Sequence, residues 1–417
     1  MFESMLRQRA EDYRTVYIDM DSFFASAEQQ RRPELKGRAV GVCPHISEGG
    51  CIVAASREAK RLGVKTGMRV RDAQAIAPDI VLVRDTPAYY RAIHAQVLRI
   101  LEATPCRLDV RGIDEMRLVV PSYMRNELAV EQLIRGIKAA LRAQLGDTLT
   151  ASLGVGANGW QAKMASAFRK PDGQFVLRQD ELAEFYRQIK LIDCTGIRHR
   201  LSRRLYQMGI FSPLDLYSAP EPLLRQQLGV NGTKWYLRLR GVEVDERAER
   251  PKQSIGHQTT LMPRAAETPA QLMSVVVKMM LKVGYRLRAS QRQARAMAIS
   301  VRFMESGWWG DVARHLDPIS SHRELVRTAE GLLKPLTSQF RSVKKVSIVT
   351  FDLIAAQQQS WLRERDLRGE YLSEALDELR RRFGARAIGP ASALSDEVFP
   401  DRIGFGAPEK LLLPDIE

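Results

Sequence analysis

The stretch that decides the fold reads Val16-Tyr17-Ile18-Asp19-Met20-Asp21-Ser22-Phe23-Phe24 and lies near the start of the 417-residue chain. Its first three residues are apolar and predict a short buried strand. Asp19 and Asp21 are two residues apart, so an extended chain would carry both carboxylates on the same side. A strand that ends in acids beside a tight aromatic turn is suited to hold a hard divalent cation. A simpler interpretation is that these Asp residues cap the following helix.

The charge of the chain indicates a polyanionic partner. Lys and Arg outnumber Asp and Glu by 64 to 49, which gives a net charge of +15 and a pI near 9.8. Such a surplus favours nucleic acid, while a ribosome-associated or membrane-surface protein would also carry it. We see no long uncharged apolar run that would span a membrane and no signal-peptide core at the start. We therefore predict a cytoplasmic protein with no membrane partner.

The four cysteines show no CxxC spacing, which is typical of a reducing compartment. Cys43, His45 and Cys51 are close enough in sequence to suggest a zinc site, but no fourth ligand is evident. We expect them to be ordinary loop residues.

Beyond residue 85 the apolar pattern alternates between helix and strand periods. Helices are predicted over 87–104 and around Val130 to Leu145, and strands over 107–110, 116–120 and 149–155. With the first strand included and 25–85 treated as an insertion, the order is β-α-β-β-α-β. This order predicts an antiparallel or mixed sheet with helices on one face, within an α+β fold.

In this topology the turn at 112–115 lies beside the end of the first strand. Asp114 and Glu115 would then converge on Asp19 despite their distance in the sequence. Three carboxylates at one end of a sheet repel one another unless cations neutralise them. Two Mg²⁺ ions would do so and would suit phosphoryl chemistry.

The rest of the chain predicts three further parts. Residues 151–177 predict a strand, a helix, a turn and a strand, and Lys170 precedes the turn. From 186 to 245 short helices rich in Arg and Leu surround Gly196-Ile197-Arg198-His199-Arg200, which resembles half of a helix-hairpin-helix, a motif that binds the phosphate backbone without reading sequence. After a charged linker, residues 253–353 repeat the β-α-β-β-α-β order. The segment 252–354 holds 16 Lys and Arg against 7 Asp and Glu, a net charge of +9.

Four motifs together resemble the Y-family of translesion DNA polymerases, over about residues 14–355. They are Asp19-Met20-Asp21-Ser22-Phe23-Phe24, Ala55-Ser56-Arg57-Glu58-Ala59-Lys60, Gly112-Ile113-Asp114-Glu115 and Ala165-Ser166-Ala167-Phe168-Arg169-Lys170-Pro171. The resemblance implies a right-hand polymerase of bacterial type with a βαββαβ palm, small fingers, a helical thumb and a βαββαβ little finger. The implied ranges are palm 1–24 and 86–177, fingers 25–85, thumb 178–245, linker 246–253, little finger 254–354 and tail 355–417.

By position, the resemblance implies a role for each site residue. Asp19 and Asp114 would bind two Mg²⁺ ions, Glu115 would complete the acidic cluster, and Met20 would contribute its carbonyl. Phe24 would be the steric gate against a ribose 2′-OH. The triphosphate would be held by the amides of Asp21, Ser22, Phe23 and Phe24 and by the side chains of Arg57, Lys60 and Lys170. The partners would be primer-template DNA and dNTPs, in low-fidelity, low-processivity synthesis during the SOS response to DNA damage.

The sequence departs from the family pattern at three places. Gly112, Met116 and Arg117 stand where relatives often have Ser, Ala and an aromatic residue around the two acids. The Thr, Tyr and Arg trio that grips triphosphate in DinB-type relatives appears as Ala54, Arg57 and Lys60, closer to the UmuC-like branch. In the thumb turn, Arg198 replaces a glycine.

Two other interpretations of the whole chain are possible. One is a polymerase-like accessory protein without catalysis, which loss of the acids would indicate, but all three are present. The other is a nucleotidyl cyclase, which would not need the basic second domain. In the tail, Gln358, Trp361 and Leu362 lie where UmuC-like relatives carry a sliding-clamp peptide, although the segment would also suit a polar loop.

Overall fold

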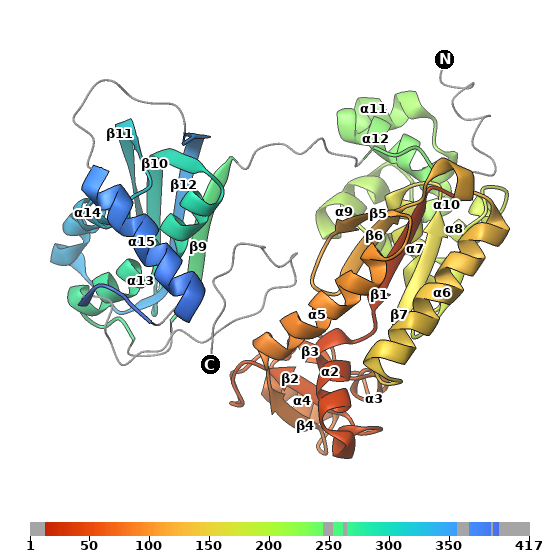
Figure 1. Cartoon of the computed structure of the whole chain (residues 1–417). Coiled ribbons are helices and arrows are strands. Elements are labelled where there is room, and N and C mark those ends of the chain that lie inside the picture. Colours follow the sequence, from red (N-terminus) through yellow and green to blue (C-terminus); the bar gives the residue numbers. More distant parts are fainter. Residues whose placement is uncertain (1–12, 245–252, 262–264, 357–366, 385–386, 392–417) are drawn as a thin grey trace. The chain divides into compact units, whose positions relative to one another are not determined.

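The computed structural model describes residues 13–244, 253–261, 265–356, 367–384 and 387–391. These residues form two compact units, one before and one after the predicted linker (Figure 1). The predicted linker at 246–253 falls almost entirely outside the described residues. Among the residues described, no helix is long and apolar enough to cross a membrane.

The first unit is built on a five-stranded sheet of order β5-β6-β1-β7-β8. Its strands are β1 (Thr15–Met20), β5 (Arg107–Val110), β6 (Glu115–Val119), β7 (Ala151–Gly156) and β8 (Gln174–Val176). All neighbours are antiparallel except β7 and β8. The mixed sheet confirms the prediction, and β6 begins one residue earlier than predicted, so that Glu115 lies in the strand.

Helices cover both faces of this sheet. Helices α5 (Pro87–Glu102) and α6 (Glu127–Leu145) bury their apolar sides against one face, where Val16 and Ile18 of β1 point. Helix α7 (Gly159–Phe168) packs on the opposite face, where a Cβ on Gly154 would come within 2.1 Å of the α7 backbone. The prediction of helices on one face is therefore confirmed for α5 and α6, the helices of the predicted β-α-β-β-α-β unit, and α7, which follows that unit, covers the other face. Helix α7 can approach the sheet this closely because Gly154 has no side chain.

The insertion after β1 forms a small lobe. It begins with α2 (Phe23–Arg31) and contains a three-stranded sheet of order β3-β2-β4. Its other elements are η1 (Pro33–Leu35), β2 (Val40–Cys43), β3 (Ala54–Ala55), α3 (Arg57–Arg61), α4 (Val70–Ile76) and β4 (Val81–Arg84). A core of its own, which includes Ile52, Val64 and Val70, holds the lobe together.

Short helices complete the first unit and pack on α7 around Trp160 and Trp235. They are α8 (Leu182–Gln188), η3 (Leu191–Asp193), α9 (His199–Gln207), α10 (Pro213–Ser218), α11 (Glu221–Leu228) and α12 (Val230–Leu239); η2 (Ser122–Met124) precedes α6. In the turn before α9, Gly196 has a φ of +96°, in the left-handed region that favours glycine.

The second unit has a four-stranded sheet of order β11-β10-β12-β9 with its helices on one face. Its elements are β9 (Ser254–Thr260), α13 (Pro269–Ala289), β10 (Arg292–Phe303), β11 (Trp308–Ile319), α14 (His322–Leu333), η4 (Lys334–Gln339), β12 (Val343–Ala355) and α15 (Leu367–Phe383). The repeated β-α-β-β-α-β order is confirmed.

Helix α15 is part of the second unit. The Arg288 Nε of α13 lies 2.6 Å from Asp377 Oδ2 of α15, and Ser373 Oγ accepts a hydrogen bond from His322 N. The compact unit thus extends past the boundary predicted at 354 and includes this helix.

Candidate active site

The end of β1 and the turn before β6 lie side by side, as predicted. Asp19 is the register partner of Glu115, and Met20 N donates to Asp114 O at 2.9 Å. The turn is also held by His94, a buried residue of α5, whose Nδ1 donates to Ile113 O at 2.7 Å. Sequence reasoning missed His94, because a histidine on an apolar helix face gives no sign of its partner.

The two aspartates of this site are poorly solvated. Burial raises the pKa of Asp19, although Lys170 Nζ lies 2.5 Å from Asp19 Oδ1 and opposes the rise. Burial, with repulsion from Asp19 and Glu115, raises the pKa of Asp114 to about 6. Burial of like charges is the arrangement that a cation relieves.

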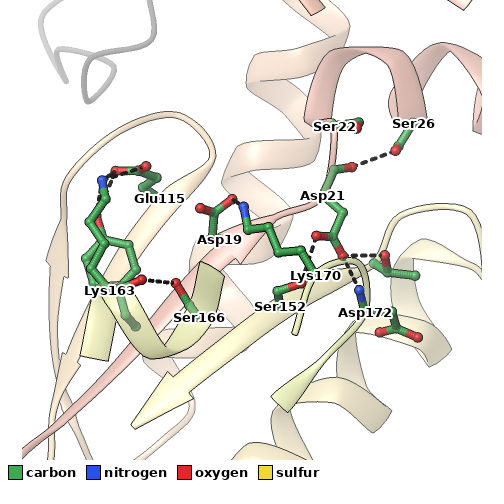
Figure 2. Close-up of polar contacts among 12 residues, drawn as sticks. Asp19, Asp21, Ser22, Ser26, Glu115, Ser152, Lys163, Ser166, Lys170 and Asp172 are labelled. Carbon is green, nitrogen blue, oxygen red and sulfur yellow. Dashed lines mark hydrogen bonds and ion pairs between the residues drawn. The ribbon is translucent and has the colours of Figure 1, made fainter. Parts of the chain in front are cut away.

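Glu115 is held apart from this pair. Lys163 Nζ of α7 donates to its two carboxylate oxygens at 2.6 and 2.8 Å (Figure 2). Tyr17 Oη donates to Oε2 at 2.7 Å. Burial raises the pKa of Glu115, but these hydrogen bonds outweigh it and bring the pKa below its usual value. No group of three or more His, Cys, Asp or Glu residues within the described part of the chain is arranged to hold a metal ion. Sequence reasoning missed both Tyr17 and Lys163.

Asp21 connects the strand end to the loop that carries Lys170. Its Oδ1 accepts from Ser152 Oγ at 2.8 Å, and its Oδ2 accepts from Asp172 N at 2.7 Å (Figure 2). The same Oδ2 accepts from Thr150 Oγ1 at 2.8 Å. The residue that caps α2 is Ser22, whose side chain makes no capping hydrogen bond. The simpler interpretation of these aspartates as helix caps is therefore wrong.

The backbone amide of Asp21 is also occupied, because Asp21 N donates to Thr150 O at 2.9 Å. The prediction that this amide holds triphosphate is corrected accordingly. Ser22, Phe23 and Phe24 remain at the beginning of α2, where helical amides have no carbonyl partner within the helix.

The three basic residues predicted to bind triphosphate lie at one corner of the site, which is formed by Asp19, Asp21 and Ser22. Lys60 Nζ donates to Ser22 Oγ at 2.8 Å, and burial, together with the charge of Lys170, lowers the pKa of Lys60. Arg57 lies 3.6 Å from Asp21 Oδ2 and donates to Thr150 Oγ1, so it ties the small lobe to the sheet. Lys170 lies at Asp19, as described above.

Several predicted residues do not join this corner. Gln358, Trp361 and Leu362 lie outside the described residues. Arg117 is buried and pairs with Asp109 and Glu243 on the α7 side of the sheet. Phe23 and Phe24 differ from these residues: their backbone lies beside the corner at the beginning of α2, while their side chains are buried, with exposed fractions of 3% and 2%.

Comparison with known proteins gives the family. The impB/mucB/samB family model matches residues 18–167, and the model of its C-terminal domain matches residues 252–362. DNA polymerase IV of Pelotomaculum thermopropionicum is 29% identical over 391 residues, which are 91% of this chain and 95% of that protein. DNA polymerase IV of Bacteroides fragilis is 26% identical over 334 residues, 80% of this chain and 91% of that protein.

A solved structure agrees in fold. The Y-family DNA polymerase chimera Dbh-Dpo4(243-245)-Dbh has a TM-score of 0.67 and 25% identity, and the match covers 82% of this chain and 99% of that one. A mixed sheet with acids at one strand end, a small inserted lobe, a helical segment and a second sheet domain thus define a Y-family DNA polymerase. The chain belongs to the impB/mucB/samB family and is DinB-like. It is a DNA-directed DNA polymerase of the translesion type.

Proposed function

We propose that the chain extends a primer by two-metal-ion nucleotidyl transfer, with Asp19 and Asp114 as the ligands of two Mg²⁺ ions and Met20 contributing its carbonyl. The donor set suits this metal, because Mg²⁺ prefers carboxylate and carbonyl oxygens. The raised pKa values of both aspartates also favour a site that a cation completes. When bound, such ions stabilise the charge on the entering and leaving oxygens of phosphoryl transfer.

The lysines of the site have a second task. Lys170 is paired with Asp19 of β1 and Lys60 with Ser22, the N-cap of α2, so the two ammonium groups lie at the end of β1 and at the beginning of α2. We infer that they bind the triphosphate of the incoming dNTP together with the amides of Ser22, Phe23 and Phe24, because anions are favoured at helix N-termini. Arg57 contributes a further positive charge to this triphosphate site. It belongs to the small lobe and contacts Asp21 and Thr150 of the sheet unit.

Glu115 takes part in a different way from the two aspartates. Both of its oxygens already accept from Lys163, and one also accepts from Tyr17. We infer that Glu115 adds negative charge to the site and fixes Lys163, and that it becomes a metal ligand only if these bonds open.

The remaining roles follow from the family. Phe24 is proposed as the steric gate against ribonucleotides, and the second unit as the main grip on primer-template DNA. Both fit synthesis of low fidelity and low processivity. A sliding-clamp peptide at Gln358, Trp361 and Leu362 rests on resemblance alone, and Trp361→Ala would test it by loss of clamp-stimulated extension with unchanged extension in the absence of clamp.

The observation that carries the mechanism is the convergence of Asp19 and Asp114 at one strand end. Asp114→Ala should abolish dNMP addition in a primer-extension assay with dNTPs and Mg²⁺ and should leave DNA binding nearly intact, because the acid acts through bound metal charge. Asp79→Ala, which removes an exposed acid of the small lobe, is the control. Substantial extension by the Asp114 variant would contradict the proposed ligands.

A further inference from the structure

The proposed gate ring rests on a second aromatic ring. Phe24 of α2 stacks on Tyr90 of α5, with ring centroids 4.5 Å apart and planes inclined by 16°. Tyr90 has no exposed surface, and Phe24 keeps only 2%. The Phe23 ring is tilted against both, with its centroid 5.6 Å from that of Phe24 and 6.5 Å from that of Tyr90. The position of the Phe24 ring is therefore set by what holds Tyr90.

Tyr90 is held by a buried carboxylate. Its Oη donates to Glu28 Oε1 at 2.7 Å, and the Glu28 side chain is fully buried. Glu28 Oε2 has no hydrogen-bond partner among the described residues, and Arg32 Nε lies 3.8 Å away. A carboxylate buried with so few partners is unfavourable for stability, so its position calls for a role other than stability.

Glu28 and Phe24 lie four residues apart on α2, on the side of the helix that faces α5. The contact chain Phe24, Tyr90, Glu28 therefore begins and ends on one helix and passes through a ring of another. Such a closed arrangement restricts both the tilt and the slide of the Phe24 ring. Rejection of a hydroxyl by contact depends on displacements well below 1 Å, because packed interiors yield little.

We propose that Tyr90 and Glu28 are positioning residues for sugar discrimination: they fix the Phe24 ring at the distance that excludes a ribose 2′-OH. This inference rests on the proposed role of Phe24 as the steric gate. Neither residue needs to touch the nucleotide, and both act through Phe24.

The test measures the ratio of kcat/KM for rNTP to that for dNTP in single-nucleotide extension. Tyr90→Phe removes the hydroxyl and keeps the ring, and Glu28→Leu removes the acceptor. Each should raise the ratio by about threefold to tenfold, since misplacement by a fraction of an ångström is enough to change rates by such factors. Glu28→Gln keeps an acceptor oxygen and should restore most of the discrimination. Tyr89→Phe, at the neighbouring position, is the matched control and should leave the ratio unchanged.

A double variant separates this inference from the proposed gate. If Tyr90 acts through Phe24, then Tyr90→Phe should add nothing to the ratio in the Phe24→Ala background. An unchanged ratio in Phe24→Ala alone would refute the gate itself. A raised ratio in Phe24→Ala with wild-type ratios in both Tyr90→Phe and Glu28→Leu would refute only the positioning role. The ratio is insensitive to the fraction of folded enzyme, so loss of stability cannot imitate the effect.

Discussion

At the scale of single residues, the ionised form of Asp114 is destabilised by its surroundings in the folded protein. Its pKa is raised to about 6 by burial and then by Asp19 and Glu115. Folding therefore favours its protonated form relative to the unfolded chain. Between pH 4 and 6 the folded state binds more protons at this group, so the free energy of unfolding falls as the pH rises.

We predict that Asp114→Asn stabilises the metal-free protein above pH 6. In EDTA at pH 7.5 the free energy of unfolding should increase by about 2 to 3 kcal/mol, since one pKa unit corresponds to about 1.4 kcal/mol. The gain should shrink as the pH falls below 6 and should disappear below about pH 3, where the carboxyl is protonated in both states. Denaturant unfolding across this pH range measures it, with the exposed Asp79→Asn as control. A variant that is less stable than wild type at pH 7.5 would show that the ionised form of Asp114 is not destabilised.

At the scale of elements, Asp21 connects the end of β1 to β7 and to the loop of Lys170 through hydrogen bonds of its side chain. Its two oxygens accept from Ser152, Thr150 and the backbone of Asp172. The position of Lys170, two residues before Asp172, depends on these hydrogen bonds. Asp21 thus serves the triphosphate indirectly, through the loop that it holds.

We predict that Asp21→Asn raises the KM for dNTP by about tenfold or more, because an amide nitrogen cannot accept the bonds that one carboxylate oxygen accepts now. Loss of these buried bonds should also lower the free energy of unfolding by about 1 to 3 kcal/mol. Steady-state kinetics and denaturant unfolding measure the two effects. Asp193→Asn, at an exposed position of the helical segment, is the control. A normal KM in a destabilised Asp21 variant would show that the loop does not position Lys170.

The sequence predicted elements better than the partners of individual side chains. Apolar periodicity revealed the strands of both sheets and the helices α5, α6, α13 and α14, because burial of one face leaves a regular pattern. It did not show that Glu115 turns toward Lys163, since neighbouring acids in a turn look alike in sequence. It also missed that α15 belongs to the second unit, because that helix packs through small and polar residues such as Gly369 and Ser373.

At the scale of the whole molecule, the second unit has one sheet face that carries no helix among the residues that the structure describes. Apolar residues of β10 and β12 such as Ile299 and Ile348 face the helices, so their strand neighbours face outward. The outward residues are Trp308, Gly310, Val312, Arg314, Ala296, Ala298, Ser300, Arg302, Lys345, Ser347, Val349, Phe351, Ser254, Gly256, Gln258 and Thr260. This set contains three cations and no acid, so the open face is a platform suited to phosphate.

We predict that the open face binds the DNA backbone. The triple variant Arg302→Ala, Arg314→Ala and Lys345→Ala should weaken primer-template binding at low salt and make the slope of log K against log salt shallower by about 2 to 3 units. This value follows from about 0.9 per phosphate contact on duplex DNA. The weakening should be the same for different DNA sequences, because phosphate contacts carry no sequence information.

The matched control removes the same charge from the helical side of the unit. Arg323, Arg327 and Lys334 are exposed on and just after α14, and their triple alanine variant should keep the wild-type slope. Fluorescence anisotropy over a salt series measures both variants. If the two variants lower the slope equally, affinity comes from the net charge of the unit. If only the α14 variant lowers it, the helices face the DNA. Only a selective effect on the sheet face agrees with a platform that holds the duplex by its phosphates and leaves the bases unread.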